Sequence, residues 1–308
     1  MKRVLITGGR GFIGRQCLPL LAARGFEVHA TCTEPPAAGQ MPGDERVTWH
    51  AVDLHDHAAV ARLLEQVKPT HLLHLAWRAV HGDLWNTPQN LDWLQTSLAL
   101  LRAFEAGGGQ RVTVCGTCGE YDWADGLCRE DHTPLRPNTF YGSCKHAIHV
   151  AAEGLGRISD LQVAWGRVFF VYGPGEHPNR LAAAVIRGLL RGEPVETSHG
   201  RQVRDYAHVA DVANGLVTLL DHEATGAFNL ATGQTLMLRD LIGEAARQIG
   251  RPELVKLGAR PAAAHEPPII LADMRKTQQV LGWSPKLDLE AGVRQTIEWY
   301  RADPARGS

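Results

Sequence analysis

The sequence predicts an α/β fold in which a doubly wound parallel sheet is followed by a smaller C-terminal α/β lobe. Three observations lead to this prediction. Short β-rich runs alternate with amphipathic stretches of helical length, the first run leads into a glycine-rich turn, and the texture of the chain changes after about residue 170. Strands that alternate with helices pair in parallel through right-handed crossovers, and helices then cover both faces of the sheet.

The alternation extends over the first half of the chain, which we interpret as one domain comprising residues 1–168. The expected strands are Arg3–Thr7, Val28–Thr33, Val47–Val52, His71–Leu75, Arg111–Cys115 and Leu161–Val168. The expected helices lie near Gly11–Arg24, Ala58–Gln66, Leu91–Ala106 and Phe140–Gly156.

Residues 169–308 differ from the first half in composition and in the spacing of the expected elements. Pro and Gly become frequent, and long loops separate helices that we expect at Leu181–Arg191 and Leu238–Ile249. We interpret this part as a smaller lobe rather than an independent domain, because segments such as Val209–Leu220 are apolar enough to return to the sheet.

Composition and charge disfavour several classes of protein. Hydrophobic residues make up 44% of the chain, which suits a globular protein with a sizeable core. The 32 basic and 33 acidic side chains give a formal charge of −1, so nucleic acid and anionic membranes are poor candidates for partners. The first apolar run is too short for a signal peptide and no later run reaches membrane-spanning length, so we expect a cytoplasmic protein.

The cysteines and histidines give no metal or disulfide pattern. The 6 cysteines are too sparse for a disulfide scaffold, so we expect free thiols. Cys115 and Cys118 form a C-x-x-C sequence, but it ends an apolar run rather than starting a helix, which disfavours a redox motif. The histidines are scattered and form no H-E-x-x-H pattern, so we predict that no metal is bound.

The first strand runs into a turn with glycine at positions 8, 11 and 14, which predicts a Rossmann-type dinucleotide site. Gly8 permits a tight turn, Gly11 allows backbone to approach a pyrophosphate, and Gly14 allows the helix to pack closely. The helix start then offers N–H groups and partial positive charge to phosphates. The expected cofactor contacts in this motif are Gly8, Arg10, Gly11, Phe12, Ile13 and Gly14.

The end of the second strand bears on the choice between NAD and NADP(H). An acidic residue there binds the adenosine ribose of NAD, but Cys32 stands at about that position. A small neutral group leaves room for a 2′-phosphate, with which Arg10 would pair. We therefore favour NADP(H). In the alternative, Arg10 is solvated, Glu34 reaches the ribose and the cofactor is NAD.

Two further strand ends are expected to contact the cofactor. Asp53 and Leu54 follow the third strand, where a carboxylate would accept from the adenine amino group; the alternative is that Asp53 caps the next helix. Leu75, Ala76 and Trp77 follow the fourth strand at the same edge of the sheet, where ligands of open α/β sheets bind.

Tyr141 and Lys145 are the candidate proton-transfer pair. They lie four residues apart at the start of an expected helix, so their side chains share a face. An ammonium group near the phenol would stabilise the phenolate, and lowering the tyrosine pKa by about three units takes roughly 4 kcal/mol. Thr117, after the fifth strand, would hold the reacting oxygen of the substrate, although it is also a common residue type in turns.

These motifs together resemble the extended short-chain dehydrogenase/reductase family, in particular its NAD(P)-dependent nucleotide-sugar epimerase/dehydratase/reductase branch. The resemblance spans nearly the whole chain. It rests on Thr7–Gly14, Asp53-Leu54, His74–Ala76, Tyr141 with Lys145, Tyr172–Pro174, Arg204–Tyr206, His208-Val209, Asp211-Val212 and Leu281–Pro285.

The resemblance implies a role for each site residue. Tyr141 is the expected acid/base, Lys145 holds the nicotinamide ribose, and Thr117 stands for the usual Ser or Thr. Asn179 and Arg204 are the expected further substrate contacts, with Arg204 gripping the diphosphate as a bidentate fork. In the alternative, Arg204 forms a structural ion pair with Asp205 or Asp211.

Departures from the family pattern limit the reaction. Relatives that eliminate water carry an Asp-Glu pair after the Thr, where this chain has Cys118 and Gly119. In GDP-fucose-synthase-like relatives a Cys and a His serve epimerisation, but Cys118 is one place away from that pattern and Ala184 stands near the position of the His. Phe170 and Trp93 replace asparagines that are common in relatives, which leaves the sugar and its base open.

Simple hydride transfer at a sugar carbon, expected at carbon 4, remains. The NADP preference favours a 4-ketoreductase slightly over a 4-epimerase that keeps its cofactor bound. A non-catalytic dinucleotide sensor is a further alternative, because a fold does not fix a function. The resemblance also implies a homodimer formed through the helices near Leu91–Ala106 and Phe140–Gly156.

Overall fold

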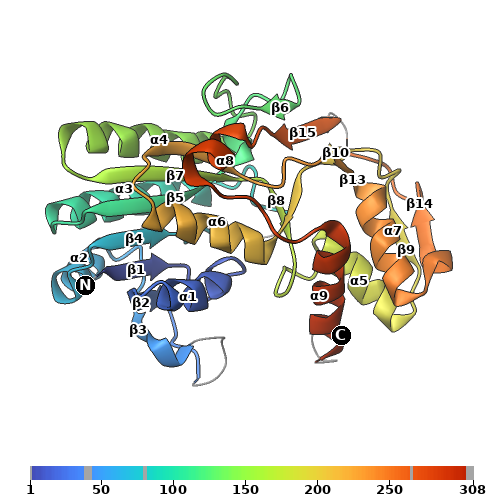
Figure 1. The fold of residues 1–308 in the computed structure, drawn as a ribbon, viewed down its shortest axis with the longest axis horizontal. Helices are drawn as coiled ribbons and strands as arrows, with labels where there is room; N and C mark the ends of the chain where they lie inside the picture. Colours follow the sequence, from blue (N-terminus) through green and yellow to red (C-terminus); the bar gives the residue numbers. More distant parts are fainter. Residues whose placement is uncertain (1, 38–43, 79–81, 264–265, 303–308) are drawn as a thin grey trace.

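The computed structural model describes residues 2–37, 44–78, 82–263 and 266–302. At its centre is a seven-stranded parallel sheet with the strand order β12-β7-β5-β4-β1-β2-β3 (Figure 1). The strands are β1 (Arg3–Thr7), β2 (Glu27–Cys32), β3 (Val47–Ala51), β4 (His71–His74), β5 (Arg111–Thr117), β7 (Gln162–Val168) and β12 (Gly226–Leu230). The order reverses between β1 and β4, which creates the crevice where ligands bind in such sheets.

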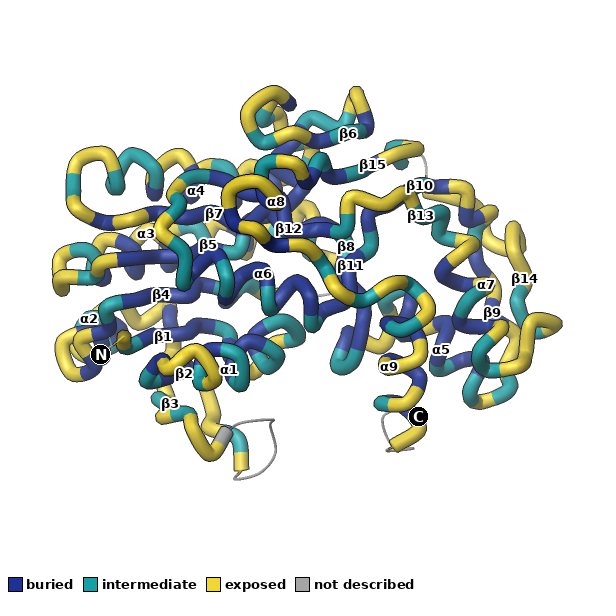
Figure 2. The backbone as a smooth tube through the Cα atoms, viewed as in Figure 1, coloured by how far each residue is buried: buried dark blue, intermediate teal, exposed yellow. Residues whose placement is uncertain are grey.

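Helices cover both faces of the sheet. Helices α1 (Gly14–Ala23) and α6 (Val209–Asp221) cover one face, and α2 (His57–Val67), α3 (Gln89–Ala106) and α4 (Phe140–Ile158) cover the other. Strand alternation explains the two cores, because Val4 and Ile6 join the first core cluster whereas Leu5 joins the second. Figure 2 shows the central strands as the most continuously buried part of the chain.

The predicted doubly wound α/β fold is confirmed. The first expected helix begins at Gly14 rather than Gly11, because residues 11–13 belong to the turn. The fifth strand continues two residues beyond Cys115 and ends at Thr117. The segment Val209–Leu220 returns to the sheet as helix α6, whereas β12, which the sequence did not predict, pairs with β7.

The C-terminal half has a core of its own. Helices α5 (Leu181–Arg191), α7 (Leu238–Ile249) and α9 (Leu289–Arg301) pack together around a third buried cluster. A four-stranded sheet lies beside them in the order β13 (Leu236–Met237), β10 (Val203–Arg204), β15 (Ile269–Ala272) and β6 (Leu127–Cys128). The remaining elements are β8 (Phe170–Tyr172), β9 (Val195–Thr197), β11 (Tyr206–His208), β14 (Val255–Leu257), α8 (Arg275–Leu281) and the 3-10 turns η1 (Asp44–Arg46), η2 (Cys118–Glu120) and η3 (Pro252–Leu254).

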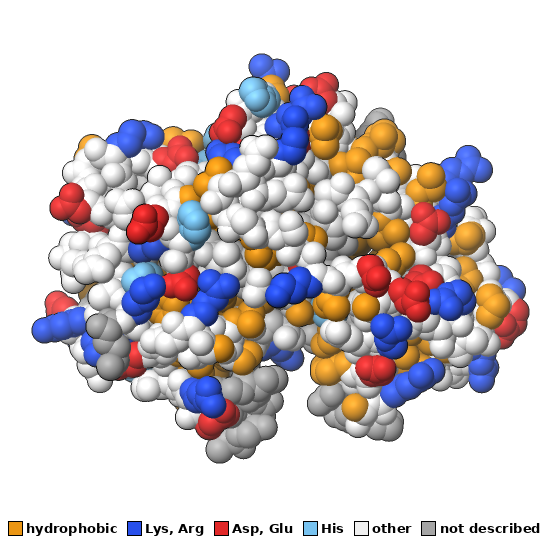
Figure 3. All heavy atoms as spheres, in the orientation of Figure 1, with side chains coloured by type: hydrophobic (Ala, Val, Ile, Leu, Met, Phe, Trp, Pro, Cys, Tyr) orange, Lys and Arg blue, Asp and Glu red, His pale blue; other side chains and the backbone are white. Residues whose placement is uncertain are grey.

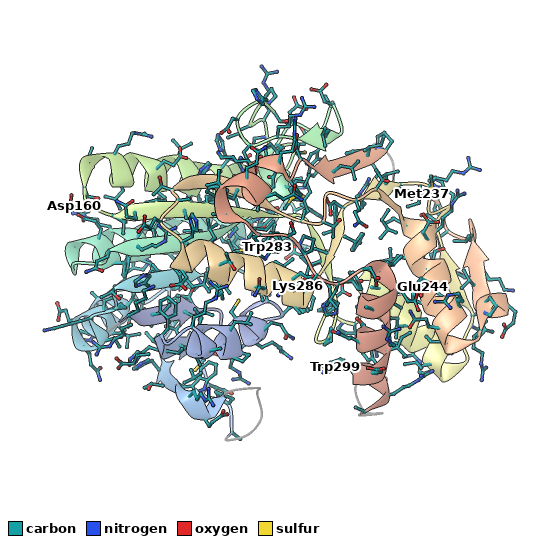
Figure 4. The ribbon with its side chains drawn as sticks, viewed as in Figure 1. Asp160, Met237, Glu244, Trp283, Lys286 and Trp299 are labelled. Carbon is teal, nitrogen blue, oxygen red and sulfur yellow. The ribbon has the colours of Figure 1, made fainter. Side chains whose placement is uncertain are left out.

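The segment between α8 and α9 is tied to helix α6. The indole N–H of Trp283 donates to Asn214 at 2.9 Å, and the carboxylate of Asp211 accepts from the backbone N–H groups of Lys286 and Leu287, each at 3.0 Å. Figure 4 labels Trp283 and Lys286 where this segment passes α6. Polar contacts therefore join the C-terminal helices to a helix that packs on the central sheet.

The surface has no dominant charge on the face shown in Figure 3, where basic and acidic side chains are interspersed. No helix in the described residues combines the length and apolar character needed to cross a bilayer. All 6 cysteines are free thiols.

Buried histidines predict how stability depends on pH. Burial lowers the pKa of His74 to about 3 and the pKa values of His71 and His208 to about 4. Because these values lie below the ordinary one, the unfolded chain binds protons first, and the stabilisation present above about pH 6.5 is lost as the pH falls. We expect each histidine to lower the free energy of unfolding, measured with urea, by up to about 1.4 kcal/mol per pH unit between pH 6.5 and 5. H71N should therefore show a smaller decrease than the wild type over this range, and equal slopes in the two proteins would contradict the prediction.

Candidate active site

The glycine turn lies against the end of β4. Gly8 has a φ of +72°, and a Cβ there would lie 2.9 Å from the backbone nitrogen of Ala76. A Cβ at Gly14 would lie 2.1 Å from the carbonyl oxygen of Gly8, and Gly11 donates to that same carbonyl at 2.9 Å. Backbone thus approaches backbone where side chains do not fit. This cradle is suited to the pyrophosphate of a dinucleotide.

The remaining residues of the turn anchor it. Phe12 and Ile13 are partly buried against the first core cluster, and no side chain caps the start of α1. His74 lies on β4 below the turn and bridges Thr7 and Ser97, with ring nitrogens 2.7 and 2.9 Å from the two hydroxyl oxygens. The hydroxyl of Thr7 also accepts from the backbone N–H groups of Leu75 and Ala76, each at 3.2 Å. The predicted contacts Leu75 and Ala76 are therefore next to the turn.

The end of β2 brings together the residues that bear on cofactor choice. The guanidinium of Arg10 donates to the carbonyl oxygen of Glu34, just after the strand. Burial raises the pKa of the Cys32 thiol, and the charge of Arg10 lowers it. Arg10, Cys32 and Glu34 thus lie close together where a Rossmann sheet receives the adenosine ribose.

Asp53 and Leu54 lie at the end of β3. Leu54 is buried in the second core cluster, whereas Asp53 is exposed and accepts from the N–H of His55 at 2.9 Å. The alternative that Asp53 caps the next helix is wrong. That helix begins at His57, and Asp56 caps it by accepting from Ala59 at 2.9 Å.

The structure brings Thr117, Tyr141 and Lys145 together. Thr117 is the last residue of β5, and Tyr141 lies in the first turn of α4 with its hydroxyl hydrogen-bonded to Thr117. One turn further along α4, the ammonium of Lys145 donates to the carbonyl of Cys115 at 3.0 Å. Gly142 permits this arrangement, because a Cβ there would lie 2.2 Å from the carbonyl oxygen of Gly119.

Burial shifts the pKa values of Tyr141 and Lys145 in opposite directions. It raises the pKa of the Tyr141 phenol, while the hydrogen bond from Thr117 lowers it. Burial lowers the pKa of Lys145, of which 3% is exposed. Each group in its charged form would stabilise the other, because opposite charges at short range favour ionisation. The site can therefore exchange a proton with an alcohol or a ketone.

Aromatic side chains frame Tyr141 on two sides. The rings of Trp77 and Trp85 meet it edge-on, with ring centroids 5.7 and 5.9 Å away. Trp85 also accepts from the backbone N–H of Tyr141 through its carbonyl at 2.9 Å. Trp85 lies in a turn without periodicity and was not predicted from the sequence. Trp93, expected as a replacement for Asn, packs against Trp77 at 6.1 Å.

A buried carboxylate lies behind Thr117. Glu120 is fully buried and accepts from the backbone N–H of Thr117 at 2.8 Å, the indole of Trp165 at 2.9 Å and the guanidinium of Arg167 at 3.0 Å. Arg167 also donates to Tyr121 at 3.0 Å. This network was not predicted from the sequence. An arginine within the apolar run of β7 was the available signal, since a buried charge requires a partner.

One cluster of possible metal ligands occurs among the described residues, formed by Glu120, His146 and His149. The guanidinium of Arg167 bonds to Glu120 and lies 3.2 Å from a ring nitrogen of His149. Arg167 thus already supplies the positive charge that Glu120 needs. The absence of a metal stays a prediction.

Cys118 and Gly119 occupy the two positions after Thr117 where water-eliminating relatives carry acids. Cys118 is buried, and burial raises the pKa of its thiol. The nearby carboxylate of Glu120 is bound by Arg167 and Trp165. Cys118, Gly119 and Glu120 therefore supply no proton-transfer group. Thr117 and Tyr141 remain the candidates for that role.

The expected substrate contacts lie in the C-terminal half. Asn179 is exposed and lines a cavity of about 370 Å³ formed by α5, α7 and the segment around β9. Arg204 is 3% exposed, donates to Glu266 at 2.8 Å and lies 5.5 Å over the ring of Phe170. Glu266, which directly precedes Pro267 and Pro268, was not predicted from the sequence.

The alternative ion pairs of Arg204 with Asp205 or Asp211 are wrong. Asp205 accepts from Thr232 and Gly233 instead, at 2.6 to 2.8 Å. Asp211 accepts from the backbone after α8. Both acids therefore support loops, and Arg204 takes its partner from a different segment.

A family model confirms what the geometry indicates. The model described as "NAD dependent epimerase/dehydratase family" matches residues 4–231. This chain belongs to that family. The match includes the glycine turn, Thr117, Tyr141 and Lys145, and it shows an enzyme of the extended short-chain dehydrogenase class.

Individual relatives support the same assignment. A UDP-glucose 4-epimerase of Rhizobium leguminosarum bv. trifolii is 27% identical and covers 96% of this chain and 97% of its own. A dTDP-4-dehydro-6-deoxy-D-allose reductase of Streptomyces sp is 27% identical, and the match covers 97% of this chain and 96% of the reductase. The structure of a UDP-glucose 4-epimerase of Thermus thermophilus in complex with NAD has a TM-score of 0.84 and 28% identity, with 97% and 99% covered.

The buried pair of Glu120 and Arg167 allows a stability test. We expect R167M to lower the free energy of unfolding by about 3–5 kcal/mol, because it leaves the Glu120 carboxylate buried without its cation. E120Q/R167M should recover part of the loss, since glutamine removes the charge and keeps an oxygen for Thr117. Urea denaturation measures both.

R294M serves as the control for this test. It removes an exposed pair with Glu290 and should change the free energy of unfolding by less than about 1 kcal/mol. A loss in R167M as small as that in R294M would show that the buried pair is not important for stability.

Proposed function

We propose that this protein is a nucleotide-sugar 4-epimerase that oxidises and then reduces carbon 4 of a hexose linked to a nucleoside diphosphate. The proposal is supported chiefly by the contact between the hydroxyls of Tyr141 and Thr117, with Lys145 one helical turn away. It also takes support from the similarity to proteins named as UDP-glucose 4-epimerases. The turn that Gly8 and Gly14 form would hold the NAD pyrophosphate.

In this mechanism the chain's own residues move one proton and hold one oxygen. Tyr141, as the phenolate, takes the proton of the 4-hydroxyl, and Lys145 stabilises the phenolate charge. The turn at Gly8 and Gly14 would hold NAD, which would supply the hydride acceptor and donor needed for inversion at carbon 4. Thr117 donates to the keto oxygen, and Tyr141 gives the proton back when the alcohol forms again.

The absence of further acid/base groups beside Thr117 favours this reaction over loss of water. Elimination needs groups that remove and donate protons at neighbouring carbons, and Cys118 and Gly119 offer none. Epimerisation at carbon 4 needs one acid/base and a bound hydride carrier. Tyr141 supplies the first, and the glycine turn suits the second.

A 4-ketoreductase using NADPH is the second candidate, and the sequence alone favours it slightly. Arg10 bonds to the carbonyl of Glu34 at the end of β2, beside Cys32 rather than an acid. That arrangement would accept a 2′-phosphate. The similarity to a reductase agrees with it. The similarities to epimerases and to a structure with NAD favour epimerisation.

We propose a division of labour along the chain. Residues 1–168 would hold the dinucleotide, and residues 169–308 would hold the nucleotide of the substrate, except that α6 and β12 complete the sheet. The cavity beside Asn179 would take the base and ribose. Arg204 would bind the diphosphate in place of the Glu266 carboxylate, since a guanidinium binds both anions as a fork.

The nucleotide carried by the purified protein tests the proposal. Denaturing the protein should release NAD in about a one-to-one ratio, and the protein should interconvert UDP-glucose and UDP-galactose, or another nucleotide-sugar pair, without added cofactor. Y141F should retain the nucleotide and lose about 10²–10⁴-fold in turnover. A protein that retains no NAD and reduces a 4-keto sugar only with NADPH would instead be the reductase. Full function in Y141F would indicate a sensor.

We also propose a homodimer formed through α3 and α4. Large apolar side chains are exposed on both helices, among them Leu91 (47%), Leu98 (37%) and Val150 (52%). Such a surface fits a second copy of the chain. In light scattering, the protein should have the mass of a dimer and L98E/V150E that of a monomer. A wild-type monomer at micromolar concentration would exclude this dimer, and I158E, which replaces an apolar residue at the end of α4, serves as the control.

A further inference from the structure

Lys145 carries a positive charge inside the protein with little compensation. Its ammonium donates to the carbonyl of Cys115 at 3.0 Å. Burial lowers its pKa, and the Cys115 thiol and the Glu120 carboxylate act in the opposite direction. Burial raises the pKa of Cys115, so that thiol is neutral, and Glu120 is already paired with Arg167. A buried ammonium in this setting requires another source of stabilisation.

The indole ring of Trp77 meets this requirement. The Lys145 nitrogen lies over the ring, 4.1 Å from its centroid, which is well within the roughly 6 Å range of cation–π attraction. Indole is the strongest of the aromatic side chains in this interaction. Among the described residues, Trp77 is the one aromatic ring that Lys145 covers in this way.

The plane of the indole is fixed by a buried amide. The Trp77 N–H donates to Asn90 at 3.0 Å. Asn90 is 1% exposed and donates in turn to the carbonyl of Leu84 at 2.8 Å. Trp77 also contacts Tyr141, because the two rings meet edge-on with their centroids 5.7 Å apart.

We propose that Trp77 is a positioning residue that keeps the Lys145 ammonium charged and directed toward Tyr141, a role that rests on the proposed function of this site. From the sequence, Trp77 is expected to contact the cofactor, because it follows β4 at the edge of the sheet where ligands bind. That contact stays a prediction, and the role proposed here acts through Lys145.

The groups that face Lys145 set the direction of the effect. From β4 comes His74, which is neutral because burial lowers its pKa to about 3. Cys115 of β5 and Glu120 of η2 act on Lys145 by their charges, and Tyr141 precedes Lys145 by one turn on α4. Removing the π face of Trp77 leaves the ammonium less stabilised, so the pKa of Lys145 falls. The phenolate of Tyr141 then loses its cationic neighbour at lower pH.

The test measures the titration of Lys145 directly in the protein as purified, with its bound nucleotide. Lysine labelled with ¹³C at Cε gives few signals, because the chain has few lysines. They are Lys2, Lys68, Lys145, Lys256, Lys276 and Lys286. K145R identifies the Lys145 signal by its loss.

We expect the pKa of Lys145 to fall by about 0.5–1 unit in W77L, and by less in W77F, which keeps a weaker π face. The alkaline limb of the pH profile of kcat should move in the same direction by a similar amount. W85L is the matched control, because Trp85 also meets Tyr141 edge-on, at 5.9 Å, and the Lys145 titration should be unchanged in it.

An unchanged Lys145 titration in folded W77L would overturn the proposal, as would an equal shift in W85L. If a thermal melt shows that W77L does not fold, W77F is used instead. A Lys145 pKa in W77F equal to that of the wild type would also overturn the proposal. The titration is read without turnover. A Lys145 shift in a protein that acts on no nucleotide-sugar would therefore reject the proposed function and keep this inference.

Discussion

The candidate active site depends on one close backbone contact. The first turn of α4 lies so near the carbonyl of Gly119 that Gly142 has no room for a side chain. This contact brings the helix that carries Tyr141 and Lys145 against the end of the strand that carries Thr117. A side chain at Gly142 would separate the phenol from the hydroxyl, whatever the state of the other residues. The chemistry of the site thus rests on how closely one helix start packs.

The same principle operates at the glycine turn of residues 8–14. Gly8 lies against the backbone after β4, and Gly14 lies against the carbonyl of Gly8. These contacts are local in sequence, with a strand, a turn and a helix in immediate succession. For that reason the sequence alone predicted the sheet, the turn, and the grouping of Tyr141 with Lys145 on one helix. The spacing of four residues is itself the geometry of a helix face.

Side-chain partners from distant segments could not be predicted from the sequence. Glu120 binds Arg167, which lies 47 positions later in the chain, and Arg204 binds Glu266, which lies 62 positions later. No periodicity links such residues, so the sequence analysis either missed them or chose neighbouring acids for Arg204. Trp77 shows a related limit. Its position after β4 was predicted, but the direction of its ring depends on Asn90 in α3, which nothing local reveals.

The place of β12 in the sheet has a consequence for synthesis. Strand β7 ends at Val168, but its outer partner spans Gly226–Leu230, and the helix α6 that covers the adjacent core comes just before that partner. A nascent chain that has just completed β7 therefore has an open sheet edge and an uncovered apolar face until about sixty more residues have emerged. During that interval the growing polypeptide is prone to pair with other chains, so chaperone binding would matter most before the C-terminal half is complete.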